Sequence, residues 1–125
     1  MGGPLGGLKV LDIATIIAAP LAATLLADYG ADVLKIERPG QGDGVRYFPP
    51  FRDGKPLWWK TANRNKKFAT LDLRTPEGLL LFKQMLPRFD VLIEDYVGQD
   101  NREVYQDWLG LSAREIEELT RKKVI

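Results

Sequence analysis

The stretch that decides the fold is LKVLDIATIIAAPLAATLLADYGADVLKIE, residues 8–37. Its first part, Leu8–Ile13, is a short apolar run that predicts a buried strand. The middle predicts a helix, because Pro20 suits a first helical turn and Gly30 suits a helix end. A second apolar run, Ala31–Glu37, predicts another buried strand. A strand, a helix of about three turns and a second strand form a βαβ unit with parallel strands.

Downstream segments repeat this alternation of strands and helices. They are a strand at 68–73, a helix that begins after Thr75 and ends before Pro87, a strand at 90–96 and a helix from Ser112 to about Thr120. This order predicts an α/β fold with a mostly parallel, doubly wound sheet. Residues 122–125, KKVI, are typical of the start of a strand. We therefore expect residues 1–125 to be the N-terminal part of one incomplete domain, with no second domain in this chain.

The composition excludes several classes of site. Lys and Arg total 18 against 17 Asp and Glu, so a net charge of +1 predicts no nucleic-acid partner. No cysteine is present, which fits a reducing compartment, and we expect a cytoplasmic protein. No histidine is present, which removes the commonest neutral-pH acid/base group and metal ligand. The most apolar segment, Val10–Ala27, contains Asp12 and Pro20, which argues against a membrane span.

Ligands of open α/β sheets bind beyond the carboxyl ends of the strands, and this chain places polar residues there. They are Glu37, Arg38, Asp72, Arg74, Glu94 and Asp95. Arg38, on a glycine-rich turn, suits a phosphate because a guanidinium offers bidentate donors, and the helix start at 16–20 adds backbone N–H groups. The alternative, favoured by composition alone, is that Arg38 pairs with Asp43 or Glu37 at the surface. The glycines of G-x-G-x-x-G are missing, so an NAD-type site is not expected.

Three further groups each have two interpretations. NRNKK, residues 63–67, either steers an anionic ligand or, as the simpler hypothesis, is a solvated loop. Trp58 and Trp59 either stack on a base or, more commonly for such pairs, anchor a core or interface. Glu94 and Asp95 suggest an acid/base pair, but adjacent strand residues face opposite sides of a sheet.

Taken in order, three blocks of sequence resemble the N-terminal segment of the family III CoA-transferases. The blocks are PLGGLKVLDIATIIAAPLAATLLADYGADVLKIERPGQGD, residues 4–43, NRNKKFATLDLRTPEG, residues 63–78, and DVLIEDY, residues 90–96. That family includes carnitine-CoA, formyl-CoA and bile-acid CoA-transferases and 2-methylacyl-CoA racemases. The resemblance implies a Rossmann-like large domain in a dimer of interlocked, ring-shaped subunits. Its substrates would be a CoA thioester and a carboxylic acid, with no prosthetic group.

The resemblance also implies which residues contact CoA. The loop after the first strand would lie along the nucleotide, Arg38 would contact a phosphate, and the segment after the LDL strand would border the adenosine. Asp95 stands where the family usually has Asn. A longer and more acidic segment follows it, and there the family's arginine contact with CoA would be made by Arg102. The implied CoA contacts are Ile16, Ile17, Ala18, Arg38, Leu71, Arg74, Asp95, Tyr96 and Arg102.

No aspartate of this chain matches the family's catalytic aspartate, which forms mixed-anhydride and CoA-thioester intermediates. The leading hypothesis is therefore the CoA-binding N-terminal portion of a family III CoA-transferase, inactive alone, whose parent moves CoA from an acyl-CoA to a carboxylic acid. One alternative is a fragment of a 2-methylacyl-CoA racemase, which abstracts a proton α to a thioester. Another is a non-catalytic α/β binding or interaction module. A truncated sheet exposes an edge, so we expect a homodimer or association with the remainder of the fold.

Overall fold

The computed structural model of the chain describes residues 2–125. The chain divides into two compact units, one that ends at Asp95 and one that runs from Tyr96 to Ile125. The first unit contains the sheet and the helices that pack on it, and the second contains two helical segments. None of the helices in residues 2–125 is long and apolar enough to cross a membrane.

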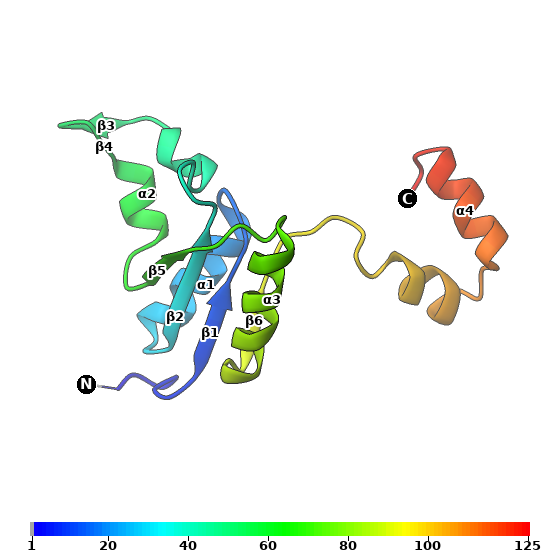
Figure 1. The fold of residues 1–125 in the computed structure, drawn as a ribbon, viewed down its shortest axis with the longest axis horizontal. Coiled ribbons are helices and arrows are strands. Elements are labelled where there is room, and N and C mark those ends of the chain that lie inside the picture. Colours follow the sequence, from blue (N-terminus) through cyan, green and yellow to red (C-terminus); the bar gives the residue numbers. More distant parts are fainter. Residues whose placement is uncertain (1) are drawn as a thin grey trace. The chain divides into compact units, whose positions relative to one another are not determined.

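The first unit is built on a four-stranded parallel sheet with the strand order β5-β2-β1-β6 (Figure 1). The strands are β1 (Lys9–Asp12), β2 (Asp32–Glu37), β5 (Lys67–Thr70) and β6 (Val91–Ile93). In the central register Val10 lies opposite Val33 on one side and Val91 on the other. The predicted α/β class with a mostly parallel sheet is confirmed.

Two helices, α1 (Ala18–Asp28) and α3 (Pro76–Met85), form separate cores with alternate residues of the sheet. Val10 packs with Ala23 in the core beneath α1, whereas Leu11 packs with Phe82 in the core beneath α3. Successive side chains of a strand point to opposite faces, so the two cores lie on opposite faces of the sheet (Figure 1). This two-sided burial explains why the central strands are apolar runs rather than alternating sequences.

The buried face of α1 differs from the one that its leucines predict. Leu21 is 36% and Leu25 50% exposed, whereas Ala23 and Thr24 are fully buried. Leucines spaced at i and i+4 are typical of a buried helix face, but here they face outward. Small side chains let the helix axis approach the sheet closely, and the Thr24 hydroxyl is satisfied there by the Pro20 carbonyl at 3.0 Å.

The start of α3 follows from its sequence. The Thr75 hydroxyl accepts a hydrogen bond from the Gly78 N–H at 3.0 Å, and Pro76 occupies the first helical position, as predicted. Gly78 is buried, and a Cβ at this position would lie 1.9 Å from the Asp72 carbonyl oxygen. The glycine of the TPEG block is therefore required by close packing of the helix on the preceding turn. A short 3-10 segment, Leu86–Arg88, continues the helix.

The connection between β2 and β5 contains several short elements. Its elements are η1 (Gly44–Tyr47), the hairpin strands β3 (Phe51–Arg52) and β4 (Lys55–Pro56), and α2 (Leu57–Ala62). Two aromatic residues of this connection are exposed, Tyr47 to 63% and Phe51 to 52%. Trp59 instead provides the packing, because its ring lies 5.2 Å from that of Phe68.

The second unit contains a π-helical segment, η3 (Glu103–Trp108), and α4 (Ala113–Arg121). Ser112 and Glu115 form the predicted capping box at the start of α4. The strand expected at residues 122–125 is wrong. Lys123 has a φ of 55° and the Val124 N–H donates to the Leu119 carbonyl, so these residues form a Schellman turn that ends the helix.

Substituting Gly78→Ala tests the close packing at the start of α3. Although alanine favours helices, we expect the variant to lose about 1–3 kcal/mol in the free energy of unfolding, because the new methyl group meets backbone that cannot yield. Gln84→Ala, at an exposed position of the same helix, should stay within about 0.5 kcal/mol of the wild type. Urea denaturation of both variants measures this, and equal stabilities would contradict the packing argument.

Candidate functional site

The carboxyl end of the parallel sheet is the candidate ligand-binding edge. The strand order places β2 and β5 on one side of β1 and β6 on the other, with α1 and α3 on opposite faces. The direction in which strands are added to the sheet therefore reverses between β1 and β6. Ligands of doubly wound sheets bind at such a switch point. The two loops at this point are joined, because the Thr15 N–H and hydroxyl donate to Asp95 Oδ2 at 3.0 and 3.2 Å.

Three consecutive backbone N–H groups of the loop after β1 donate to three different carboxylates. Ala14 N–H donates to Asp12 Oδ1 at 3.1 Å, Thr15 N–H to Asp95 Oδ2 at 3.0 Å, and Ile16 N–H to Asp43 Oδ1 at 3.0 Å. A run of N–H groups of this kind commonly binds an anion. Here the protein's own carboxylates occupy it, so an external anion finds these three groups already engaged.

The next N–H groups of this segment are open. No described residue accepts a hydrogen bond from the N–H of Ile17, Ala18 or Ala19, and Pro20 has no N–H. They form the first turn of α1, where the helix dipole adds partial positive charge. The predicted contacts Ile16, Ile17 and Ala18 therefore lie together on a segment suited to an anion, with the unsatisfied donors beginning at Ile17.

Arg38 lies exposed, directly after β2. The alternative that it pairs with Glu37 or Asp43 is wrong, because both of those carboxylates are buried and engaged elsewhere. Glu37 accepts two hydrogen bonds from Arg46, at 2.8 and 2.6 Å, and Asp43 Oδ2 lies 3.0 Å from Lys35 Nζ. Within residues 2–125 the Arg38 guanidinium has no hydrogen-bond or ion-pair partner, which leaves its donors available to a ligand.

Leu71 and Arg74, from the segment after β5, lie at the same edge as Arg38. The Leu71 N–H donates to the Glu37 carbonyl at 2.9 Å, which places Leu71 beside the end of β2. Arg74 forms a bidentate pair with Asp72 at 2.8 and 2.5 Å. This pair, with a smaller contribution from the charge of Arg38, lowers the pKa of Asp72 to about 2. Two guanidinium groups thus lie near the Asp72 carboxylate, where β2 and β5 end.

Beneath this edge lies a buried cluster of four charged side chains, called here the charged cluster. Its members are Asp12, Lys35, Asp43 and Lys66, with side chains no more than 1% exposed. Lys35 Nζ donates to the Ala14 carbonyl at 2.7 Å and also lies 3.7 Å from Asp12 Oδ2. The two positive and two negative charges compensate one another, as buried charges require.

Lys66 uses all three of its donors inside the protein. They reach Asp12 Oδ2 at 2.9 Å, the Pro20 carbonyl at 2.6 Å and Asn63 Oδ1 at 2.9 Å. Burial lowers the pKa of Lys66, and the hydrogen bond to Asp12 opposes that shift. The hypothesis that residues 63–67 form a solvated loop is therefore wrong for Asn63 and Lys66. A lysine and an aspartate inside the apolar strands KVLD and DVLKIE were the signal for such a cluster, since charges in a buried strand need partners.

Arg46 connects the loop after β2 to α2. Its guanidinium lies 3.5 Å from the centroid of the Trp59 ring while it pairs with Glu37. The hydrogen bond to Glu37 raises the pKa of Arg46, so the group stays charged. Trp59 thus anchors the packing within the first unit, in line with the anchor interpretation of the tryptophan pair.

Comparison with known proteins identifies the family of the chain. The sequence model of CoA-transferase family III matches residues 5–122. The chain belongs to this family. The beta subunit of succinyl-CoA–L-malate CoA-transferase from Chloroflexus aurantiacus is 49% identical over 94 residues, which cover 74% of this chain and 23% of that protein. Human succinyl-CoA:glutarate CoA-transferase is 40% identical over 95 residues, with 75% and 22% coverage.

Solved structures of the family share this fold. A CAIB/BAIF family protein from Brucella suis superposes with a TM-score of 0.69 at 33% identity, over 94% of this chain and 31% of that protein. A protein from Mycobacterium tuberculosis gives a TM-score of 0.67 at 32% identity, with 94% and 31% coverage. The chain therefore spans about a quarter of the length of the curated relatives and about a third of the solved structures.

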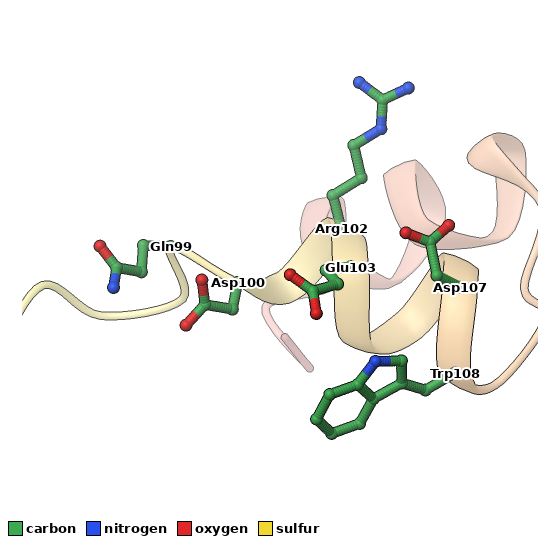
Figure 2. Close-up of a pocket in the computed structure, with 6 residues that line it drawn as sticks. All are labelled: Gln99, Asp100, Arg102, Glu103, Asp107 and Trp108. Atoms are coloured by element: carbon green, nitrogen blue, oxygen red, sulfur yellow. The ribbon is translucent and has the colours of Figure 1, made fainter.

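Tyr96 and Arg102, two of the implied CoA contacts, belong to the second unit. Figure 2 shows the pocket at η3, which is lined by Gln99, Asp100, Arg102, Glu103, Asp107 and Trp108. Arg102 Nε donates to Gln106 Oε1 at 3.2 Å, and three of the six lining residues carry carboxylates, namely Asp100, Glu103 and Asp107. This surface is acidic, and no cluster that could hold a metal ion is found in the described part of the chain. The role of Arg102 in binding CoA stays a prediction.

Substituting Lys66→Met tests the charged cluster. The variant leaves the buried Asp12 carboxylate without its main partner, and we expect it to lose about 3–5 kcal/mol in the free energy of unfolding. Lys67→Met is the matched control, because the neighbouring lysine pairs with Asp32 at the surface and should matter by less than about 1 kcal/mol. Equal losses in the two variants, measured by chemical denaturation, would contradict the cluster's role.

Proposed function

We propose that this chain supplies the CoA-binding portion of a CoA-transferase that moves CoA from an acyl-CoA to a carboxylic acid. The observation that carries the proposal is the pairing of two features at one sheet edge. The N–H groups that begin at Ile17 are open, and Arg38 has no partner among residues 2–125. CoA carries a diphosphate and a ribose phosphate, which are the anions that helix starts and arginines bind.

Each of the implied contacts at this edge has a role in the proposed complex. Ile16, Ile17 and Ala18 lie along the nucleotide, and their segment offers backbone donors to a phosphate. Arg38 contacts a phosphate through its guanidinium. Leu71 and Arg74 border the adenosine, and Arg74 is held in place by its pair with Asp72. The ligand is a substrate that binds reversibly rather than a prosthetic group.

The residues that follow β6 complete the proposed CoA contacts. The Asp95 carboxylate accepts two hydrogen bonds from Thr15, so it faces the loop after β1. An aspartate so engaged directs its Oδ2 atom to Thr15 rather than to the phosphates. Tyr96 and Arg102 are proposed as further contacts from the second unit.

We assign the chemical step to an aspartate that this chain does not carry. In the proposed reaction a carboxylate attacks the thioester carbonyl, forms a mixed anhydride and releases the CoA thiolate, so one difficult acyl transfer is divided into easier ones. Several relatives are named for succinyl-CoA with malate or glutarate as partner. This supports a dicarboxylic acyl-CoA as donor and a dicarboxylic acid as acceptor.

The assembly and location follow the same proposal. We propose that residues 1–125 act as part of a larger Rossmann-like domain, in a homodimer or in association with the rest of that fold. The exposed leucines of α3, Leu79, Leu80 and Leu81, support such an association because they present apolar surface to a partner. A cytoplasmic location is proposed from the absence of cysteine.

Calorimetric titration of CoA into the purified chain tests the proposed function. We expect Arg38→Ala to weaken CoA binding by about 1–3 kcal/mol, because a charged hydrogen-bonding partner is lost. Arg52→Ala is the matched control, since Arg52 is exposed on the β3–β4 hairpin, and its affinity should equal that of the wild type. Absence of CoA binding by the folded wild-type chain, or equal effects of the two substitutions, would contradict the proposal.

A further inference from the structure

Asp43 joins the two loops that carry the proposed CoA contacts. Its Oδ1 atom accepts hydrogen bonds from the N–H groups of Ile16 and Val45, each at 3.0 Å. Its Oδ2 atom lies 3.0 Å from Lys35 Nζ, and its side chain is 1% exposed. The loop after β1 is thereby fixed to the loop that follows Arg38.

Ile16 needs this support because of its backbone conformation. Its φ is 66°, in the left-handed region that a β-branched residue rarely adopts. Such a conformation costs free energy and persists only where surrounding contacts determine it. The hydrogen bond from the Ile16 N–H to Asp43 is the contact that acts on this residue directly. The conformation of Ile16 in turn sets the direction in which the chain enters α1.

Asp43 is itself held firmly. Its N–H donates to Glu37 Oε1 at 2.8 Å, and the same oxygen accepts a hydrogen bond from Arg46 Nε at 2.8 Å. Its position is therefore determined by β2 and by the Arg46 contact with Trp59, not by the loop that it supports. Rigid support of this kind is what a binding loop needs if its donors are to be preorganised.

We propose that Asp43 is a positioning residue for CoA binding, and this inference rests on the proposed function. It holds Ile16 in the left-handed conformation, so that the N–H groups of Ile17 and Ala18 are presented to a CoA phosphate at the same edge as Arg38. Asp43 does not contact the ligand, because one carboxylate oxygen faces two backbone N–H groups and the other faces Lys35.

The test uses Asp43→Asn, which keeps the size of the side chain. Its NH2 group must face either Lys35 or the N–H groups of Ile16 and Val45, and a donor in either place loses one of the two contacts that Asp43 makes. We expect CoA affinity, measured by calorimetry at a temperature where the variant is folded, to fall about tenfold. The Ile16 amide proton should also exchange with solvent faster than in the wild type. Adding Ile16→Asn to this variant should restore part of the affinity, because asparagine adopts positive φ more readily than isoleucine. A role in stability alone does not predict that rescue.

Two controls separate positioning from general effects. Asp53→Asn removes the same charge at the exposed β3–β4 turn, and Phe82→Leu lowers stability from the core beneath α3. Both should bind CoA like the wild type at a temperature where they are folded. Should Asp43→Asn not fold, Asp43→Ser is measured instead, since serine retains a cap for η1.

The outcomes distinguish this inference from the proposed function. If the wild-type chain binds CoA and the Asp43 variant has the same affinity and the same Ile16 amide exchange, the positioning role is overturned and the proposed function stands. Failure of the folded wild-type chain to bind CoA overturns the proposed function and the inference with it. Weakened binding with faster Ile16 exchange and partial rescue by Ile16→Asn supports both.

Discussion

The compensation of buried charge in the charged cluster is the constraint on which the rest of the first unit depends. Asp12, Lys35, Asp43 and Lys66 lie out of contact with water, and each charge is tolerated only at short distance from an opposite one. This requirement fixes the positions of β1, β2 and the start of β5 relative to one another. Apolar residues of the same volume can be equally stabilising. What the charges add is a fixed position for the loop after β1, through Lys35 and the Ala14 carbonyl.

That fixed loop explains how a chain without glycine-rich dinucleotide signatures presents open backbone N–H groups at the start of α1. Carboxylates accept from the N–H groups of Ala14, Thr15 and Ile16, and the segment that begins at Ile17 supplies the open ones. The basic residues Arg38 and Arg74 lie along the neighbouring strand ends, where Asp72 compensates one of the two charges. Any preference of this edge for an anion therefore comes from the arrangement of its hydrogen-bond donors rather than from a large net charge. This agrees with the near-neutral composition of the chain. Membership in CoA-transferase family III is the reason why CoA is proposed as the ligand of this edge.

Local signals in the sequence were sufficient for most of the fold. Apolar runs predicted the four sheet strands, and the Thr75 and Ser112 caps predicted two helix starts, because these features depend on near neighbours. The buried face of α1 was not predictable in this way. Its choice of alanines over leucines depends on how closely the helix approaches the sheet, which is a tertiary property.

In the candidate site, too, the features that depend on distant residues were not predictable from the sequence. Arg38 was predicted as a phosphate ligand. Its guanidinium is left without a partner because Arg46 pairs with Glu37, and Arg46 lies close to Glu37 only after the η1 turn forms. Lys66 was assigned to a solvated loop, because nothing near it in the sequence shows that Asp12 and Pro20 converge on it. Hydrogen bonds between residues 46 and 54 positions apart in the sequence decide which charged groups remain available to a ligand. A single sequence does not show such pairings.

The measurement that tests this account most directly is a titration of the isotopically labelled chain with CoA, followed through backbone amide chemical shifts. The account predicts the largest shifts at Ile17, Ala18 and Ala19, with small changes at Ala14 and Ile16, whose N–H groups are already bonded to carboxylates. Large shifts at Ala14 and Ile16 would show that CoA displaces those carboxylates. That result, or shifts confined to the second unit, would contradict the account.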